Sequence, residues 1–285
     1  MKASFAGFPQ EGTVFLRALR KNNRREWFQP RKQIYEEKVK APMIELVSAL
    51  NVEMMAFAPD YVSDPKKAIF RIYRDTRFSA DKSPYKTHSA AVFAKRGEDR
   101  IAGAGFYFGV SPTEIEVAGG AYGPGPQQLL AIRNHLMEHY RAFDRIVRSP
   151  GLRKLMGDLR GEQLTRVPRG IPRAHPAADH LRHKQWYFDA TLDPSLATTP
   201  RLLAELLKRF RAMTPMVEFL NDPLARIKPA PKDFVLESAL KRAVVAAPHK
   251  IGPWTLAGGA DAASFAVSAA TEAIHGQQRA ILRDG

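Results

Sequence analysis

Basic, hydroxyl and aromatic side chains alternate within residues 71–87, and side chains of these kinds hold polar ligands. The residues that we expect to bind a ligand there are Arg71, Arg74, Asp75, Arg77, Ser79, Asp81, Lys82, Tyr85 and Lys86. Cations outnumber acids in this set, and guanidinium groups bind carboxylates and phosphates through paired N–H donors. The segment therefore predicts an anionic ligand.

The two acids of this segment are expected to orient the arginines. A carboxylate among cations has a lowered pKa, which makes it a weak general base near neutral pH. Asp75 and Asp81 are therefore not predicted to be catalytic residues. No residue pattern names a reaction, so whether the protein is an enzyme stays open and the catalytic residues and any cofactor stay unknown.

A second basic segment covers residues 145–184. It contains 10 Lys and Arg against 3 Asp and Glu, while residues 66–100 contain 10 against 4, so these two segments supply most of the net charge of +15. We expect Arg169 and Arg182 of the second segment to join the first in one cleft. Such a basic surface attracts phosphorylated metabolites and nucleic acids alike.

The best interpretation is a cleft lined by Arg, Lys and Tyr that binds a phosphate- or carboxylate-bearing small molecule. Nucleic-acid binding is the first alternative, because Tyr73, Phe78 and Tyr85 lie between the cations and aromatic rings stack on single strands. A non-catalytic scaffold whose basic face meets an acidic partner is the second. The oligomeric state is not given by the sequence.

Composition excludes several classes of chemistry. The absence of cysteine excludes disulfides, thiol nucleophiles and cysteine-bound metals. His135, Glu138 and His139 match the H-x-x-E-H pattern of some zinc peptidases, but no third ligand is evident and no metal is predicted. No apolar run resembles a signal peptide or reaches the roughly 20 residues of a spanning helix, so we expect a cytoplasmic protein without membrane insertion.

The spacing of apolar residues predicts an α+β fold, with an antiparallel β-sheet meander and helices packed on it. Helices are expected over residues 12–25, 25–57 (one helix or two joined near Pro42), 126–140, 141–148, 150–159 and 200–220. Strands are expected over residues 68–74, 89–93, 101–109, 114–118 and 185–191. Residues 1–225 should form a single main domain, followed by a weakly structured extension over 226–285 with a short basic helix near 233–246.

Several motifs resemble the signature of one protein family. They are residues 22–28 (Asn-Asn-Arg-Arg-Glu-Trp-Phe), residues 70–79 and 81–87 of the basic segment, residues 119–122 (Gly-Gly-Ala-Tyr), residues 168–170 (Pro-Arg-Gly) and residues 215–221 (Pro-Met-Val-Glu-Phe-Leu-Asn). Over residues 5–221 the chain is similar to the family called domain of unknown function 2461. This resemblance implies a compact α+β domain and brings no assigned reaction. His180 and His183 stand where apolar residues are expected, so neither is predicted to be functional.

Overall fold

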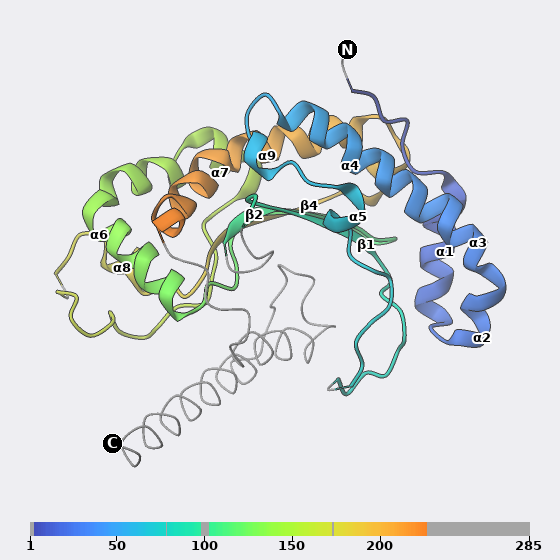
Figure 1. Ribbon diagram of the computed structural model, residues 1–285, viewed down its shortest axis with the longest axis horizontal. Coiled ribbons are helices and arrows are strands. Elements are labelled where there is room, and N and C mark those ends of the chain that lie inside the picture. Colours follow the sequence, from blue (N-terminus) through green and yellow to red (C-terminus); the bar gives the residue numbers. More distant parts are fainter. Residues whose placement is uncertain (1–2, 78, 98–102, 173, 227–285) are drawn as a thin grey trace. The chain divides into compact units, whose positions relative to one another are not determined.

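The computed structural model describes residues 3–77, 79–97, 103–172 and 174–226 (Figure 1). These residues belong to two units: residues up to 72 together with those from 86 onward form the first, and the loop Tyr73–Tyr85 belongs to the second. Each unit is described by itself. The predicted extension from residue 227 onward, with its basic helix, lies outside the described residues, and the domain boundary near 225 stays a prediction.

The first unit contains a four-stranded antiparallel sheet (Figure 1). Its strands are β1 (Ser89–Ala94), β2 (Ala104–Val110), β3 (Ile115–Ala121) and β4 (Trp186–Leu192), and each pairs with the next in chain order. This arrangement confirms the predicted meander and the α+β class. The pleat places Phe106, Phe108 and Phe188 in the hydrophobic core, while the residues between them face the other side.

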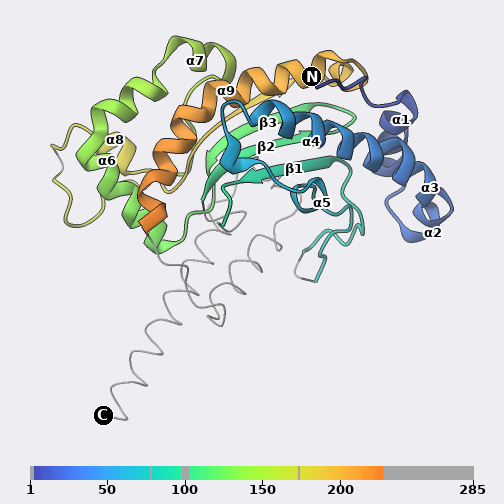
Figure 2. The same cartoon turned by 45° about the horizontal axis from the view of Figure 1, so that its top comes forward.

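Two helices cover the core face of the sheet. Both α4 (Ala41–Met54) and α9 (Arg201–Asn221) lie across the strands on this face (Figure 2). In α9 the buried residues Leu206, Phe210, Met213 and Val217 recur at helical spacing, which gives the helix one apolar face. The ring of Phe210 lies 5.0 Å from that of Phe106, so this helix and β2 share one packed layer.

Most of the other helices lie beyond the two ends of this layer (Figures 1 and 2). They are α1 (Gln10–Lys21), α2 (Arg25–Phe28), α3 (Lys32–Tyr35), α6 (Pro126–Val147), α7 (Pro150–Met156) and α8 (Ala178–Leu181), whereas the short helix α5 (Pro65–Ala68) lies beside β1. Short 3₁₀ segments cover Gln29–Arg31, Pro59–Tyr61, Pro194–Thr198 and Asp222–Arg226, and a π-helical segment covers Glu36–Lys40. The helical run predicted from residue 25 therefore exists, as a succession of short segments that leads into α4.

The strand predicted over residues 68–74 is wrong. The segment makes one isolated bridge to β1, between Ile69 and Ala91, and Phe70 donates its N–H to the carbonyl of Ala90. The next isolated bridge joins Tyr73 to Tyr85. Because the chain pairs once with β1 and then with itself, no continuous ladder forms, although the side chains alternate as they do in a strand.

Two other elements differ in extent from the predictions. The helices predicted over residues 126–140 and 141–148 belong to one element, α6, but a kink at His139, whose φ is −120° and ψ 26°, divides it into two helical parts close to the predicted boundary. The third strand extends past its predicted end and includes Gly120. This glycine has a φ of +135°, and an added Cβ would lie 2.1 Å from the carbonyl oxygen of Trp186, so β4 can pair closely with β3 only because the side chain is absent.

One buried amide joins the C-terminal end of α9 to the sheet. The side chain of Asn221 accepts a 2.9 Å hydrogen bond from the N–H of Ala104 and donates to its carbonyl at 2.8 Å. It also donates to the hydroxyl of Tyr61 at 2.8 Å. Every donor of this amide is used and its oxygen accepts a bond, so the polar group is fully matched inside the core.

Candidate functional site

The loop Tyr73–Tyr85 is closed at its base by backbone pairing. The N–H of Arg74 donates to the carbonyl of Pro84 at 2.9 Å, and the rings of Tyr73 and Tyr85 lie 5.5 Å apart. These contacts hold the two ends of the loop together, and the basic residues of the loop lie between them. In the flanking chain of the first unit, Arg71 is exposed and the ammonium of Lys86 lies 4.7 Å from the centre of the Phe70 ring.

Each acid of the loop pairs with one arginine. Asp81 accepts a hydrogen bond from Nη1 of Arg74 through Oδ2, and through Oδ1 it accepts from the N–H (2.8 Å) and the hydroxyl (2.6 Å) of Ser83. The bond from Arg74, followed by those from Ser83, holds the pKa of Asp81 well below its usual range. In the second pair, Nε of Arg77 lies 2.9 Å from Oδ1 of Asp75 and Nη2 lies 2.5 Å from Oδ2.

The two arginines differ in burial and in the use of their donors. The side chain of Arg77 is 75% exposed and presents its Nε/Nη2 edge to Asp75. The side chain of Arg74 is only 7% exposed, and it meets Asp81 through Nη1 alone. Its Nε and Nη2 are buried and have no hydrogen-bond acceptor among the described residues. The edge of a guanidinium that grips an oxyanion with two parallel bonds is thus buried and unmatched.

Other polar groups of the loop complete its surroundings. The hydroxyl of Ser79 is also buried and has no partner in the part of the chain that the structure describes. The ammonium of Lys82 donates to the carbonyl of Thr76 at 3.0 Å, and Tyr85 is buried. Three unmatched donor atoms therefore occur within one short loop, which is the pattern expected where a polar ligand binds.

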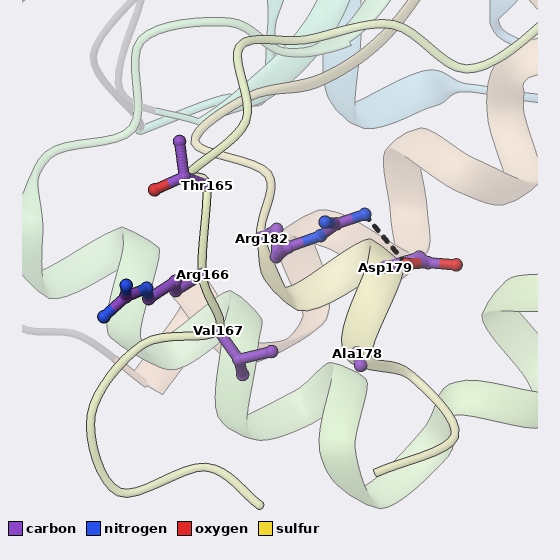
Figure 3. Close-up of a pocket in the computed structure, with 6 residues that line it drawn as sticks. All are labelled: Thr165, Arg166, Val167, Ala178, Asp179 and Arg182. Atoms are coloured by element: carbon purple, nitrogen blue, oxygen red, sulfur yellow. Dashed lines mark hydrogen bonds and ion pairs between the residues drawn. The ribbon is translucent and has the colours of Figure 1, made fainter. Parts of the chain in front are cut away.

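A surface pocket of about 430 Å³ lies in the second basic segment (Figure 3). Its lining residues are Thr165, Arg166, Val167, Ala178, Asp179 and Arg182. In Figure 3 the side chain of Arg182 points toward Asp179, and Nη2 donates to Oδ1 of Asp179 at 2.9 Å. The Nε of Arg182 is buried and finds no acceptor among the described residues. Arg169, also predicted to bind, is exposed and is not among the lining residues.

The pocket and the loop Tyr73–Tyr85 belong to different units, so the single cleft expected from the sequence stays a prediction.

Residues beside this pocket hold its backbone in place. Arg133 of α6 donates from Nε to the carbonyl of Leu181 at 3.1 Å and from Nη2 to that of His183 at 3.0 Å, and burial lowers its pKa. His183 itself is buried between Gln163, 2.8 Å from Nε2, and the carbonyl of Gln185, 3.1 Å from Nδ1. Burial lowers the pKa of His183 to about 4, so it is a neutral structural histidine at physiological pH.

A polar group that the sequence analysis missed lies on the sheet face opposite the core. The hydroxyl of Tyr107 in β2 lies 3.4 Å from Oε2 of Glu116 in β3, and Oδ1 of Asp189 in β4 lies 3.0 Å from Nε of Arg160. Burial raises the pKa of Tyr107 and, against the effect of Arg160, that of Asp189. The strict alternation of residues 186–192 was the available signal, because it places Asp189 opposite Phe188.

Metal binding has no support in the described residues, where no group of three or more His, Cys, Asp or Glu side chains could hold an ion. His135 and His139 of the H-x-x-E-H pattern do approach each other, with ring centres 4.6 Å apart. His135 lies 3.8 Å from Asp222, and His139 lies 3.8 Å from Glu138. Within the described ranges, no helix is both long enough and apolar enough to cross a membrane.

Comparison with known proteins identifies the family. A family model described as conserved hypothetical protein (DUF2461) matches residues 11–219. The chain belongs to this family. The resemblance seen in the motifs is therefore confirmed, and the matched region of this DUF2461 member includes both the loop and the pocket. The family description names no reaction, and a comparison with curated proteins found no match.

Proposed function

We propose that this protein binds a small molecule through a carboxylate or phosphate group, and that the Nε/Nη2 edge of Arg74 makes the main contact. The observation that carries the proposal is the state of this side chain: it is 93% buried, one nitrogen is held by Asp81, and the other two have no acceptor among the described residues. Among the described side chains, Arg74 alone has two such atoms. Buried donors in native proteins nearly always have partners, and an anion would supply them.

The cost of unmatched donors makes an anion the natural partner. Leaving a buried donor without an acceptor costs about 1–3 kcal/mol, and more for a charged group. A hydrogen bond between a charged donor and an acceptor contributes roughly 1.5–3 kcal/mol, so two parallel bonds to one ligand would account for millimolar or tighter binding. Water competes weakly at a buried guanidinium, which favours a specific ligand over bulk anions.

The neighbours of Arg74 have distinct roles in this proposal. Asp81 holds Nη1 and thereby sets the orientation of the guanidinium, while Ser83 holds Asp81. The hydroxyl of Ser79 can donate a further bond to the ligand. Arg77 makes no such contribution, because its own fork already faces Asp75 and its side chain is exposed.

The proposal is tested by titration of the full-length protein with acetate and with inorganic phosphate, followed by ¹⁵N NMR of the arginine Nε–H signals. The expected result is a saturable shift of the Arg74 signal. Arg74→Lys keeps the charge near Asp81 but removes the fork, so affinity should fall at least tenfold. Arg77→Lys is the matched control in the same loop and should bind within about twofold of the wild type, because the fork of Arg77 faces Asp75 and contributes no bond to the ligand.

A wild-type affinity in Arg74→Lys, or an equal loss in both variants, would contradict the proposal. Thermal unfolding of each variant checks that the fold is intact. Titration with a labelled single-stranded oligonucleotide tests the alternative function, nucleic-acid binding. Such binding releases counterions, so its affinity falls steeply as the salt concentration rises. Tight oligonucleotide binding with a steep salt slope, together with no shift of Arg74 by either small anion, would replace the small-molecule proposal.

A further inference from the structure

We infer that the ligand group recognised by this loop is a carboxylate, which carries one negative charge, and not a phosphate dianion. This inference rests on the proposed function, and it narrows the class of ligand. It draws on the charge that the folded loop has left to offer and on the shape of the donor edge at Arg74.

The loop Tyr73–Tyr85 carries only part of the positive charge of residues 71–87, because Arg71 and Lys86 lie in the flanking chain of the first unit. The charged side chains of the loop are Arg74, Asp75, Arg77, Asp81 and Lys82, which leaves a net charge of one positive. Both acids are bonded to arginines, and the low pKa of Asp81 keeps its carboxylate ionised at neutral pH. A ligand with one negative charge therefore neutralises the loop, whereas a dianion leaves one charge uncompensated.

The position of Asp81 increases this discrimination. Its Oδ2 is bonded to Nη1 of Arg74, so a ligand on the Nε/Nη2 edge of the same guanidinium lies within a few ångströms of an ionised carboxylate. Like charges at such distances repel, and the low exposure of the Arg74 side chain strengthens this effect although the Asp81 side chain is 38% exposed. Each additional negative charge on the ligand is therefore opposed by Asp81 as well as attracted by Arg74.

The donor edge has the shape of a carboxylate. The N–H groups on Nε and Nη2 lie in one plane and point in parallel, which matches the two oxygens of a planar carboxylate. A tetrahedral phosphate can also occupy such an edge, but its remaining oxygens need donors of their own. In the described part of the loop, the Ser83 hydroxyl donates to Asp81 and the exposed ammonium of Lys82 uses one of its three donors on Thr76, so the Ser79 hydroxyl is the buried side-chain donor that remains in addition to the Arg74 edge.

Three probes that share a single methyl group separate charge from shape. Acetate is a planar monoanion, methanesulfonate is a tetrahedral monoanion, and methyl phosphate is mostly a dianion at pH 7.5, because the second pKa of a phosphate monoester is about 6. Each is titrated into the full-length protein at pH 7.5 and constant ionic strength, with the Arg74 Nε–H signal as the readout. We expect acetate to bind most tightly, at least tenfold more tightly than methyl phosphate.

Asp81→Asn provides a second readout. It raises the net charge of the loop by one while the side-chain oxygen can still accept from Ser83, so methyl phosphate should gain at least fivefold relative to acetate. Asp75→Asn changes the charge of the loop equally, but Asp75 is bonded to the 75% exposed side chain of Arg77 and not to Arg74, so the ratio should change by less than twofold.

The outcomes distinguish this inference from the proposed function. Methyl phosphate binding more tightly than acetate, or methanesulfonate binding as tightly as acetate, would overturn the carboxylate assignment while the anion site stands. No shift of the Arg74 signal with any of the three probes would overturn both. An equal change of the affinity ratio in Asp81→Asn and Asp75→Asn would show that Asp81 does not face the ligand, which also overturns the inference.

Discussion

Two buried polar side chains of this protein, Asn221 and Arg74, differ in how completely they are hydrogen-bonded. Asn221, where α9 meets the sheet, uses both amide hydrogens and its oxygen in hydrogen bonds to Ala104 and Tyr61. Arg74, in the loop Tyr73–Tyr85, is almost as deeply buried but leaves two nitrogens without an acceptor among the described residues. Asn221 is thus saturated by the fold, whereas those two nitrogens of Arg74 are the observation behind the proposed ligand site.

The same distinction separates two neighbouring residues of the second basic segment, His183 and Arg182. His183 is saturated, since each ring nitrogen has a partner within 3.1 Å, and its neutral form belongs to the packing. Arg182, the preceding residue, lines a pocket and has a buried Nε without an acceptor in the described chain. Of two adjacent residues, one can thus have all its polar atoms hydrogen-bonded while the other keeps a buried donor without an acceptor. The hydrogen-bond partners in the structure show this difference, and the sequence does not.

The largest expected effect is at Asn221. Replacing it with alanine leaves the N–H and carbonyl of Ala104 without their partner inside the core and removes one of the hydrogen-bond partners of the Tyr61 hydroxyl, and each unmatched group costs about 1–3 kcal/mol. We expect Asn221→Ala to lower the free energy of unfolding by about 3–5 kcal/mol in urea denaturation. Asn134→Ala, at an exposed position of α6, is the control and should stay within about 0.5 kcal/mol of the wild type. A loss of less than 1 kcal/mol at Asn221 would show that saturation does not mark a structural group.

A smaller and pH-dependent effect is expected at His183. Its pKa is about 4 in the folded protein, mainly because of burial, and about 6.5 when unfolded. Between these values the unfolded chain binds a proton that the folded chain does not, so stability falls as the pH decreases from 6.5 to about 4, by up to roughly 1.4 kcal/mol per pH unit. His183→Gln should remove this dependence, whereas His139→Gln, at a half-exposed position, should keep it.

Urea denaturation at several pH values between 4 and 7 measures both histidine variants. Identical slopes in His183→Gln and the wild type would mean that the pKa of this histidine is the same in the folded and unfolded states. His183 would then no longer be an example of a saturated neutral group.

The sequence was sufficient to predict the order of the sheet and its main helices, since strong periodicity in residues such as Leu206, Phe210 and Val217 reflects a single buried face. It was misleading at residues 68–74, where side chains alternate but the backbone makes one isolated bridge to β1, at Ile69, and another within the loop, at Tyr73. Side-chain periodicity reports which face is buried and does not report whether another strand lies alongside. That information depends on contacts distant in the chain.

The sequence was sufficient to propose which residues form the candidate site, but not to predict how they are hydrogen-bonded to one another. The excess of cations over acids pointed to residues 71–87, yet composition cannot show that Asp81 takes one nitrogen of Arg74 while Asp75 meets the whole fork of Arg77. The group containing Tyr107, Glu116 and Asp189 escaped notice because its members come from three strands. Their proximity follows from strand register, which the sequence alone does not specify.

The smallest expected effect is also the one that tests the comparison most directly. Removing the guanidinium of Arg74 together with Asp81, whose side chain is 38% exposed, should cost the unliganded protein little, because the double variant loses two donors that have no acceptor among the described residues as well as one ion pair. Replacing a buried ion pair by less polar residues of similar size is often neutral or stabilising. We therefore expect Arg74→Met/Asp81→Asn to unfold within about 1 kcal/mol of the wild type, and to bind no acetate.

The stability of the single variant Asp81→Asn is compared with that of the double variant in the same denaturation experiment. Asp81→Asn weakens the ion pair but leaves the guanidinium buried, so without ligand it should be less stable than the double variant. If the double variant instead lost as much stability as Asn221→Ala, Arg74 would be a saturated structural group whose partners lie elsewhere in the chain. The contrast between the loop and the core would then disappear, and the donor edge of Arg74 would no longer indicate a ligand.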